Sequence, residues 1–393
     1  MQTFYIIGIS DDRNQFLSPE IRNLVSQGKV FSGGKRHHEL VHAYLPEDAV
    51  WIDITVPLDA VFCRYEEHPE IIVFASGDPL FFGFANTVMR KLPSAKIILF
   101  PTFNSLQMLA HRILLPYQEM QTLSLTGRPW DAFDSALIRG DKLIGVLTDR
   151  EKTPATIAAR MLEYGYDNYR MIVGEALGNG EEESVRTFSL EEASQSAFRF
   201  PNCLILQRNK VHPRPFGIPE SEFHLLNGRN RMITKMPVRL LTLSMLTLRE
   251  KKSFWDIGFC TGSVSIEAKL QFPELKVTAF EQRTEGKELM ERNSRKFGTP
   301  GITTVMDDFL ETELGGLPAP DAVFIGGHGG KMIEILQKIK EVLLPDGVIV
   351  FNSVSEESKA LFTKGITQIN KKVTQCTRIA VDAFNPIEIM RAE

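Results

Sequence analysis

The chain has 393 residues, with 45 lysines and arginines against 49 aspartates and glutamates, and a net charge of −4. This length predicts two or three domains, and the acidic balance disfavours a nucleic-acid binder, which usually carries excess positive charge. Apolar runs such as 97–100 are too short to cross a bilayer, and the first residues do not resemble a signal peptide. Four scattered cysteines show neither metal spacing nor a disulfide pattern. Together these features predict a cytoplasmic protein without a membrane or nucleic-acid partner.

The first half alternates short apolar runs with helical segments. Ser18-Pro19 begins a helix that ends at Gly28, and Thr153-Pro154 begins another that ends at Gly165. This alternation predicts a mostly parallel sheet covered by helices. Further helices are expected over 81–92 and 105–112, and strands over Phe4–Ile9, Val50–Ile54, Ile71–Ala75, Ile97–Phe100, Leu143–Thr148 and Cys203–Gln207.

A segment with three prolines, 209–219, separates this half from the next and cannot form a continuous helix. We therefore expect a domain over 1–208, a linker over 209–220 and a second domain over 221–393. The second domain repeats the alternation, and the runs 369–374 and 387–390 are candidates for two further strands at its end. The expected strands are Phe254–Ile257, Val277–Phe280, Ile302–Val305, Ala322–Ile325 and Val348–Phe351, and the expected helices are Ser263–Leu270, Glu285–Phe297, Lys331–Val342 and Glu356–Phe362.

A glycine-containing turn after the first strand of the second half is the most informative segment. The strand runs into Asp256 and Gly258, and the turn closes at Gly262 before a helix, so backbone N–H groups are offered to a ligand. A dinucleotide loop would read G-x-G-x-x-G, whereas this loop reads D-x-G-x-x-x-G. Asp256 would repel a pyrophosphate but can pair with an ammonium, which favours S-adenosylmethionine over NAD. Glu281, at the end of the next strand, suits the ribose hydroxyls.

Two later turns follow the third and fourth strands of this half. Asp307 and Asp308 follow the third strand, where a carboxylate can accept a hydrogen bond from the adenine amino group. The fourth strand runs into the glycine-rich loop 326–330, in which Gly326 faces the same crevice. His328 in this loop is either a proton donor or a solvated histidine.

The first half contains three strand-end turns, marked by Gly8, by Gly77-Asp78 and by Thr153. Each can serve a second cofactor site, although helix capping explains Asp78 and Thr153 equally well. His38 and His42 match H-E-x-x-H, the spacing of a zinc site on a helix. Pro46 and the absence of a clear third ligand disfavour that zinc hydrolase.

These segments together resemble the bifunctional, decarboxylating precorrin methyltransferases of cobalamin biosynthesis. Residues 1–208 resemble the tetrapyrrole methylases that methylate carbon 5. The matching pieces are Ser32-Gly-Gly-Lys-Arg-His37, Ala75-Ser-Gly-Asp-Pro79, Leu147-Thr-Asp149 with Thr153-Pro154, and Val173-Gly-Glu175 through Leu177-Gly178. Residues from 217 on resemble the partner that methylates carbon 15 and removes the acetate carboxyl of ring C. There the pieces are Gly217-Ile-Pro219, Met232-Ile-Thr-Lys235, Trp255-Asp-Ile-Gly258 with Thr261-Gly-Ser-Val-Ser-Ile-Glu267, and Asp321-Ala-Val-Phe-Ile-Gly-Gly327.

The resemblance implies an α/β protein in which a two-lobed tetrapyrrole-methylase domain precedes a Rossmann-like class I methyltransferase domain. It implies S-adenosylmethionine as cofactor, a precorrin or cobalt-precorrin as substrate, and a homo-oligomer. It adds Thr234 and Thr261 to the residues expected to bind the cofactor. Because the substrate carries many carboxylates, cationic side chains are expected around it. The candidates are Arg229, Arg231, Lys235 and Arg239, of which Arg231 and Lys235, with His328, are the expected catalytic residues.

Three other functions remain as alternatives. They are an NAD(P)-dependent oxidoreductase acting on a tetrapyrrole, the zinc hydrolase using His38 and His42, and a tetrapyrrole carrier without catalysis. The loop spacing disfavours the first, and a carrier would consume no methyl donor.

Overall fold

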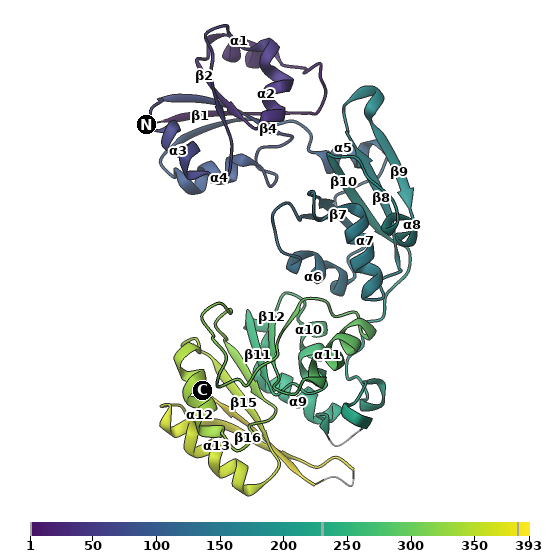
Figure 1. Cartoon of the computed structure of the whole chain (residues 1–393), viewed down its shortest axis with the longest axis vertical. Coiled ribbons are helices and arrows are strands. Elements are labelled where there is room, and N and C mark those ends of the chain that lie inside the picture. The colour runs from purple at the N-terminus through teal and green to yellow at the C-terminus, as the bar shows by residue number, and fades with distance from the viewer. Residues whose placement is uncertain (1, 229–231, 383–384) are drawn as a thin grey trace. The chain divides into compact units, whose positions relative to one another are not determined.

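The computed structural model describes residues 2–228, 232–382 and 385–393. The chain forms two compact units, which are interleaved in sequence. The first comprises Met1–Arg128, Lys142–Ala159 and Tyr169–Asn209, and the second comprises Pro129–Asp141, Arg160–Asn168 and Lys210–Glu393. Figure 1 shows their helices and strands. No helix in the described part of the chain is long and apolar enough to span a membrane.

The first sheet of the first unit has five parallel strands in the order β3-β2-β4-β1-β5. The parallel sheet expected for this part of the chain is confirmed. The helix that begins after Ser18 is also confirmed, because Ser18 accepts the backbone N–H of Ile21 and Gly28 follows the last helical residue. The strands are β1 (Thr3–Ile9), β2 (Val30–Gly33), β3 (Val50–Asp53), β4 (Glu70–Ser76) and β5 (Lys96–Phe100), and the helices are α1 (Pro19–Gln27), α2 (Lys35–Val41), α3 (Asp59–Tyr65) and α4 (Phe84–Lys91).

The second sheet of this unit, in the order β6-β7-β10-β8-β9, corrects the expectation of a mostly parallel arrangement. Only β6 and β7 are parallel, whereas β10 runs antiparallel to both of its neighbours and β8 antiparallel to β9. A short connection joins β8 to β9, and antiparallel strands need no helical crossover. The strands are β6 (Gln121–Ser124), β7 (Leu143–Leu147), β8 (Tyr169–Glu175), β9 (Ser184–Phe188) and β10 (Asn202–Arg208), and the helices from this stretch of sequence are α5 (Ser105–Arg112), α6 (Asp131–Arg139), α7 (Pro154–Glu163) and α8 (Leu190–Ser194).

The second unit contains a seven-stranded sheet in the order β13-β12-β11-β14-β15-β17-β16. The first five of these strands are parallel, and β17 pairs antiparallel with both β15 and β16. The Rossmann-like arrangement predicted from the sequence is therefore confirmed. The strands are β11 (Ser253–Ile257), β12 (Lys276–Phe280), β13 (Ile302–Val305), β14 (Ala322–Ile325), β15 (Val348–Ser353), β16 (Val373–Ile379) and β17 (Ile387–Ala392), and the helices are α9 (Met236–Leu246), α10 (Ser263–Gln271), α11 (Glu285–Lys296), α12 (Met332–Val342) and α13 (Glu356–Gln368).

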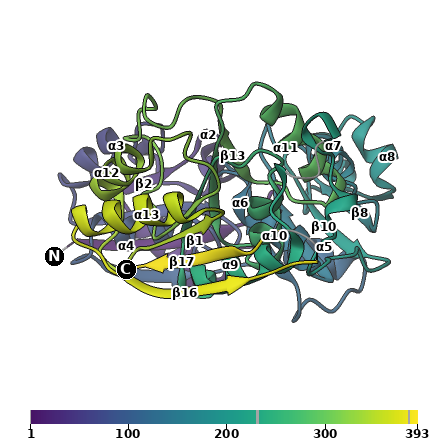
Figure 2. The ribbon, with the colours of Figure 1, turned by 90° about the horizontal axis from the view of Figure 1, so that it is seen from below.

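Helices cover both faces of this sheet, as the alternating side chains of β11 show. Trp255 and Ile257 pack in one apolar cluster with residues of α12 and α13. Phe254 packs in another with residues of α9 and α10. The strands β16 and β17 lie side by side at the edge of the sheet (Figure 2). The run 369–374 was expected to be a strand, but β16 begins only at Val373, because α13 continues to Gln368.

Candidate active site

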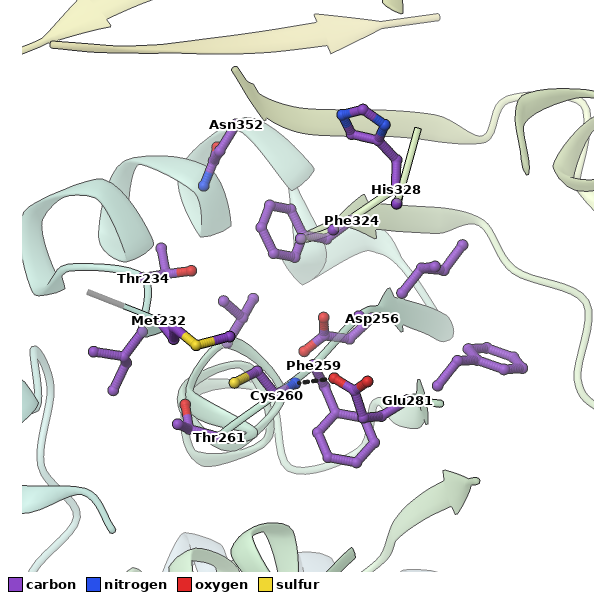
Figure 3. Close-up of a pocket in the computed structure, with 18 of the residues that line it drawn as sticks. Met232, Thr234, Asp256, Phe259, Cys260, Thr261, Glu281, Phe324, His328 and Asn352 are labelled. Carbon is purple, nitrogen blue, oxygen red and sulfur yellow. Dashed lines mark hydrogen bonds between the residues drawn. The ribbon is translucent and has the colours of Figure 1, made fainter. Parts of the chain in front are cut away.

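A cavity of about 810 Å³ lies in the second unit, at the ends of the parallel strands. The strand order reverses between β11 and β14, and ligands of such sheets bind outside the carboxyl ends of the strands at this point. Figure 3 shows this cavity, hereafter the second-unit pocket. The predicted site residues that line it are Thr234, Lys235, Asp256, Gly258, Thr261, Glu281, Asp307, Asp308, Gly326 and His328. Gly262 begins α10 beside it, and Arg231 and Arg229 lie outside the described residues.

The turn between β11 and α10 forms the floor of the pocket and depends on left-handed backbone conformations. Gly258 has a φ of +79°, and a Cβ added there would lie 2.9 Å from the backbone nitrogen of Gly327. Gly262 has a φ of +74° and is the N-cap of α10. Cys260, between them, adopts a φ of +51° although it is not a glycine. Gly258 therefore allows the loop 326–330 to approach the turn closely.

Asp256 is completely buried at the end of β11, yet it lines the pocket. Its Oδ2 accepts hydrogen bonds from the backbone N–H of Ser265, at 3.2 Å, and from the Ser265 hydroxyl, at 2.6 Å. Its Oδ1 has no hydrogen-bond partner among the described residues. Burial raises the pKa of Asp256 to about 7. A buried carboxylate oxygen without a partner fits a cationic ligand group, because the ion pair and hydrogen bond would compensate for the lost hydration of the carboxylate.

Glu281 is buried directly after β12 and accepts a hydrogen bond from the glycine turn, residues 258–262. Its Oε2 accepts the backbone N–H of Cys260 at 3.0 Å, drawn as a dashed line in Figure 3, and its Oε1 accepts that of Arg283 at 3.0 Å. Each carboxylate oxygen offers two lone pairs. Oε2 also accepts a hydrogen bond from Arg283 Nη1 at 3.5 Å, so only Oε1 keeps a lone pair available. This leaves Glu281 Oε1 able to accept a hydrogen bond from a ligand hydroxyl group.

The two aspartates after β13 differ in their availability. Asp308 forms an ion pair with Lys331, with 2.9 Å between Oδ2 and Nζ, and accepts the backbone N–H of Leu310 at 3.0 Å. The hydrogen bond from Lys331 lowers the pKa of Asp308. Asp307 is exposed, and its Oδ1 accepts the backbone N–H of Asp308 at 2.8 Å. Asp307 is therefore the better placed of the two to accept a hydrogen bond from a ligand.

His328 lies in the loop after β14, with its ring edge against Phe351 at a centroid distance of 5.8 Å. The backbone N–H of Gly330 donates to His328 Nδ1 at 3.2 Å. Because Nδ1 accepts this bond, the proton of the neutral ring resides on Nε2. Burial lowers the pKa of His328, which favours that neutral form. His328 can thus act as a hydrogen-bond donor through Nε2.

The cationic residues expected around the substrate are not equivalent. Lys235 lines the pocket. Arg239 was expected to bind substrate carboxylates, but this prediction is wrong, because its side chain is fully buried and ion-paired with Glu267. Sequence reasoning also missed Asn352, which lines the pocket and accepts a hydrogen bond from Thr242 Oγ1 at 3.1 Å. Its position near the end of β15 follows the same strand-end rule that found Asp256 and Glu281.

The first unit contains a second cavity, of about 530 Å³, hereafter the first-unit cleft. Gly77, with a φ of +62°, lies in its wall. Gly8 lies against this turn, because a Cβ added to Gly8 would be only 1.9 Å from the carbonyl oxygen of Gly77. Three residues predicted for this site are not among the described residues that line the cleft, namely Gly8, Asp78 and Thr153. Asp78 accepts the N–H of Leu80 at 2.9 Å, and Thr153 caps α7.

Two residues of the first-unit cleft were not expected from the sequence, His37 and Ser76. Their Nε2 and Oγ atoms lie 2.8 Å apart, and the N–H of Gly34 donates to His37 Nδ1 at 3.2 Å. Burial lowers the pKa of His37 to about 4. The neighbouring His38 stacks on Trp51 at 4.2 Å. No group of three or more His, Cys, Asp and Glu side chains suited to a metal is found within the described ranges, so the zinc hydrolase has no support here.

Comparison with known proteins gives matches to both parts of the chain. A family model described as a precorrin methyltransferase domain matches residues 227–392. The chain is 32% identical over 371 residues to a decarboxylating precorrin-6Y C(5,15)-methyltransferase of Sinorhizobium sp. The aligned region covers 91% of this chain and 86% of that protein. It is 33% identical over 162 residues to a decarboxylating cobalt-precorrin-6B C(15)-methyltransferase of Salmonella typhimurium, covering 41% of this chain and 83% of that protein. The crystal structure of a precorrin-6Y C5,15-methyltransferase from Geobacter metallireducens superposes on this chain with a TM-score of 0.42 and 32% identity. The match covers 47% of this chain and 99% of the chain in that crystal structure.

Proposed function

Since this chain belongs to the family of decarboxylating precorrin-6Y C(5,15)-methyltransferases, we propose that it methylates carbons 5 and 15 of a precorrin and removes the acetate carboxyl of ring C. The family predicted from the sequence is thus confirmed. The structural observation that carries the proposal is the unpartnered Oδ1 of the buried Asp256 in the wall of the second-unit pocket. The relatives give no support to a nicotinamide oxidoreductase, and the D-x-G-x-x-x-G loop argues against one.

The residues of the second-unit pocket fit S-adenosylmethionine. When bound, this cofactor supplies an electrophilic methyl group. Asp256 would hold its ammonium group, Glu281 one of its ribose hydroxyls and Asp307 its adenine amino group, while the turn at Gly258 admits the ligand close to the backbone. Asp308 is less suited, because Lys331 already occupies its Oδ2.

The remaining side chains would hold the acceptor. The meso carbons of a reduced tetrapyrrole are enamine-like, so the substrate itself supplies the carbon nucleophile. The protein then contributes mainly by aligning the reactants and excluding water, which is worth several kcal/mol. Lys235 would bind a substrate carboxylate, and His328 would donate its Nε2 proton in a hydrogen bond to the acceptor. Both residues line the same pocket as Asp256.

For the first unit we propose a cofactor site of its own in the first-unit cleft, around Gly77. Gly8 would pack against the Gly77 turn on the side away from the ligand. Asp78 and Thr153 would stabilise the backbone that follows the neighbouring strands through their hydrogen bonds to Leu80 and Thr156. The division into a C5-methylating domain over 1–208, a linker over 209–220 and a C15-methylating, decarboxylating domain over 221–393 belongs to this proposal. A cytoplasmic location and a homo-oligomeric assembly belong to it as well.

The proposal predicts the mass of the product. Purified protein incubated with S-adenosylmethionine and a precorrin, or its cobalt complex in a parallel reaction, should yield a product with two added methyl groups and one lost carboxyl group. Mass spectrometry of the tetrapyrrole measures this directly. A substrate recovered unchanged from both reactions, with no methyl donor consumed, would instead support the carrier without catalysis.

The variant Gly8→Ala tests whether the first unit contributes one of the two methyl groups. The new Cβ would collide with the carbonyl oxygen of Gly77, whose backbone would have to move. We expect a product that lacks one methyl group but has still lost its carboxyl group. Gly315→Ala is a suitable control, because nothing lies within 4 Å of a Cβ there and its backbone is not in the left-handed region. A doubly methylated product from Gly8→Ala, formed at the control's rate, would contradict this role for the Gly77 turn.

A further inference from the structure

A fully buried ion pair adjoins a segment that lines the second-unit pocket. Arg239 of α9 and Glu267 of α10 are both 0% exposed, and 2.9 Å separates Arg239 Nε from Glu267 Oε2. Removing two charges from water costs several kcal/mol per ion, so a buried pair adds little net stability by itself. Its role must therefore come from what the pair holds in place.

The two side chains join three separate segments of the second unit. Arg239 Nη1 donates to the carbonyl oxygen of Thr234 at 2.7 Å, and Nη2 donates to that of Ile218. Glu267 Oε1 accepts the N–H of Gly217 at 2.5 Å, and Oε2 accepts that of Ile218 at 3.2 Å. Every nitrogen of the guanidinium and both oxygens of the carboxylate thus have partners.

Two of the elements joined in this way, the segment 232–235 and α10, contribute lining residues to the pocket, whereas Gly217 and Ile218 do not. Residues 232–235 line it, and Met232 and Thr234 lie across it from Glu281 in Figure 3. Glu267 belongs to α10, the helix that begins at the glycine turn. A single ion pair therefore links the segment 232–235 to the helix that carries the turn.

We propose that Arg239 is a positioning residue, which through Glu267 holds the segment 232–235 at a fixed separation from the glycine turn and so sets the width of the methyl-donor site. This inference rests on the proposed function for the identity of the donor. Arginine is needed because its planar fork donates in several directions at once. A lysine would keep a charge beside Glu267, but its single ammonium would not also hold the carbonyl groups of Thr234 and Ile218.

The variant Arg239→Lys in the full-length protein tests the proposal with two readouts. The first is the rate at which trypsin cleaves after Lys235 in the absence of donor, mapped by mass spectrometry. The second is the separation of KM from kcat in methyl transfer. Loss of a hydrogen bond from a charged group corresponds to a factor of about ten or more. We expect cleavage after Lys235 about tenfold faster and a KM for the donor about tenfold higher, with kcat nearly unchanged.

Lys269→Met provides the control, on α10, the helix that carries Glu267. Lys269 is also buried, and its Nζ donates to the carbonyl oxygens of Pro273 and Leu275 at 2.8 and 2.9 Å, but it does not line the pocket. This variant should lose stability without changing either readout. Equal effects of the two variants, or wild-type cleavage and KM in Arg239→Lys, would overturn the positioning role. If the wild-type protein transfers no methyl group, the proposed function fails, while the cleavage comparison still decides whether Arg239 positions the segment.

Discussion

Replacing Asp256 with asparagine is expected to weaken donor binding in the second-unit pocket by about a hundredfold or more, because the ammonium of the donor loses a buried charged partner. The substitution keeps an oxygen for the two hydrogen bonds from Ser265. Calorimetric titration with S-adenosylhomocysteine, which carries the same amino-acid group, should lose the heat of one site per chain. Methylation at carbon 15 and loss of the carboxyl group should disappear with it.

The same variant should be more stable than the wild-type protein at alkaline pH. The pKa of Asp256 is about 7 in the folded chain against an ordinary value of 3.8. The folded state therefore holds a proton that the unfolded state has lost, and the free energy of unfolding falls as the pH rises from about 4 to about 7. A difference of about three pKa units corresponds to about 4 kcal/mol at most. Asp256→Asn removes this dependence, so its advantage in Tm should grow over that range and then level off.

Donor binding by the wild-type protein should show the opposite trend with pH. Binding of the ammonium requires the ionised carboxylate, so affinity should fall by up to about tenfold per pH unit below 7. Asp307→Asn is the control for the loss of a carboxylate at the pocket, because this exposed aspartate lines the same cavity. An Asp256→Asn variant that binds the donor normally, or whose Tm difference from wild type does not vary with pH, would disprove the role assigned to this carboxylate.

The parallel strands of the second unit were predictable because each is a short run rich in apolar and β-branched residues that leads into glycine or a polar residue. The strands β11 to β15 all appear where the sequence places them. Four strands of the first unit, β2, β6, β8 and β9, were missed. Of these, β6 and β9 are the edge strands of the second sheet, and polar residues such as those of Gln121–Ser124 leave them without an apolar run. Without them, the antiparallel character of the second sheet could not be foreseen.

The same distinction holds for the pocket. Asp256 lies near the end of β11 and Glu281 directly follows β12, so the strand-end rule found them. The burial of Arg239 was not predictable, because its partner Glu267 lies on another helix, 28 residues away. The pairing of Asp308 with Lys331, 23 residues away, was hidden for the same reason. A linear pattern therefore predicts which residues reach the pocket but not which of them are already engaged by distant partners.

Replacing Gly258 with alanine is expected to disable the second-unit pocket by steric collision. The φ of +79° costs a residue with a Cβ about 1–2 kcal/mol. In addition, the Cβ would lie 2.9 Å from the backbone nitrogen of Gly327, so the loop 326–330 would have to move. Because this loop carries His328, we expect methylation at carbon 15 to fall by at least about tenfold, together with a lower Tm.

The control variant Gly330→Ala separates the effect of backbone strain from that of steric collision. Like Gly258→Ala, it places alanine in the left-handed region. Gly330 has a φ of +86° in the same loop, but nothing lies within 4 Å of a Cβ added there. This control should therefore lose only the strain energy and retain most of its methyl transfer. Product mass and Tm, measured for both variants, give the comparison. If the two variants lose activity equally, the close approach of the loop to Gly258 is not what shapes the pocket, and strain alone accounts for the loss.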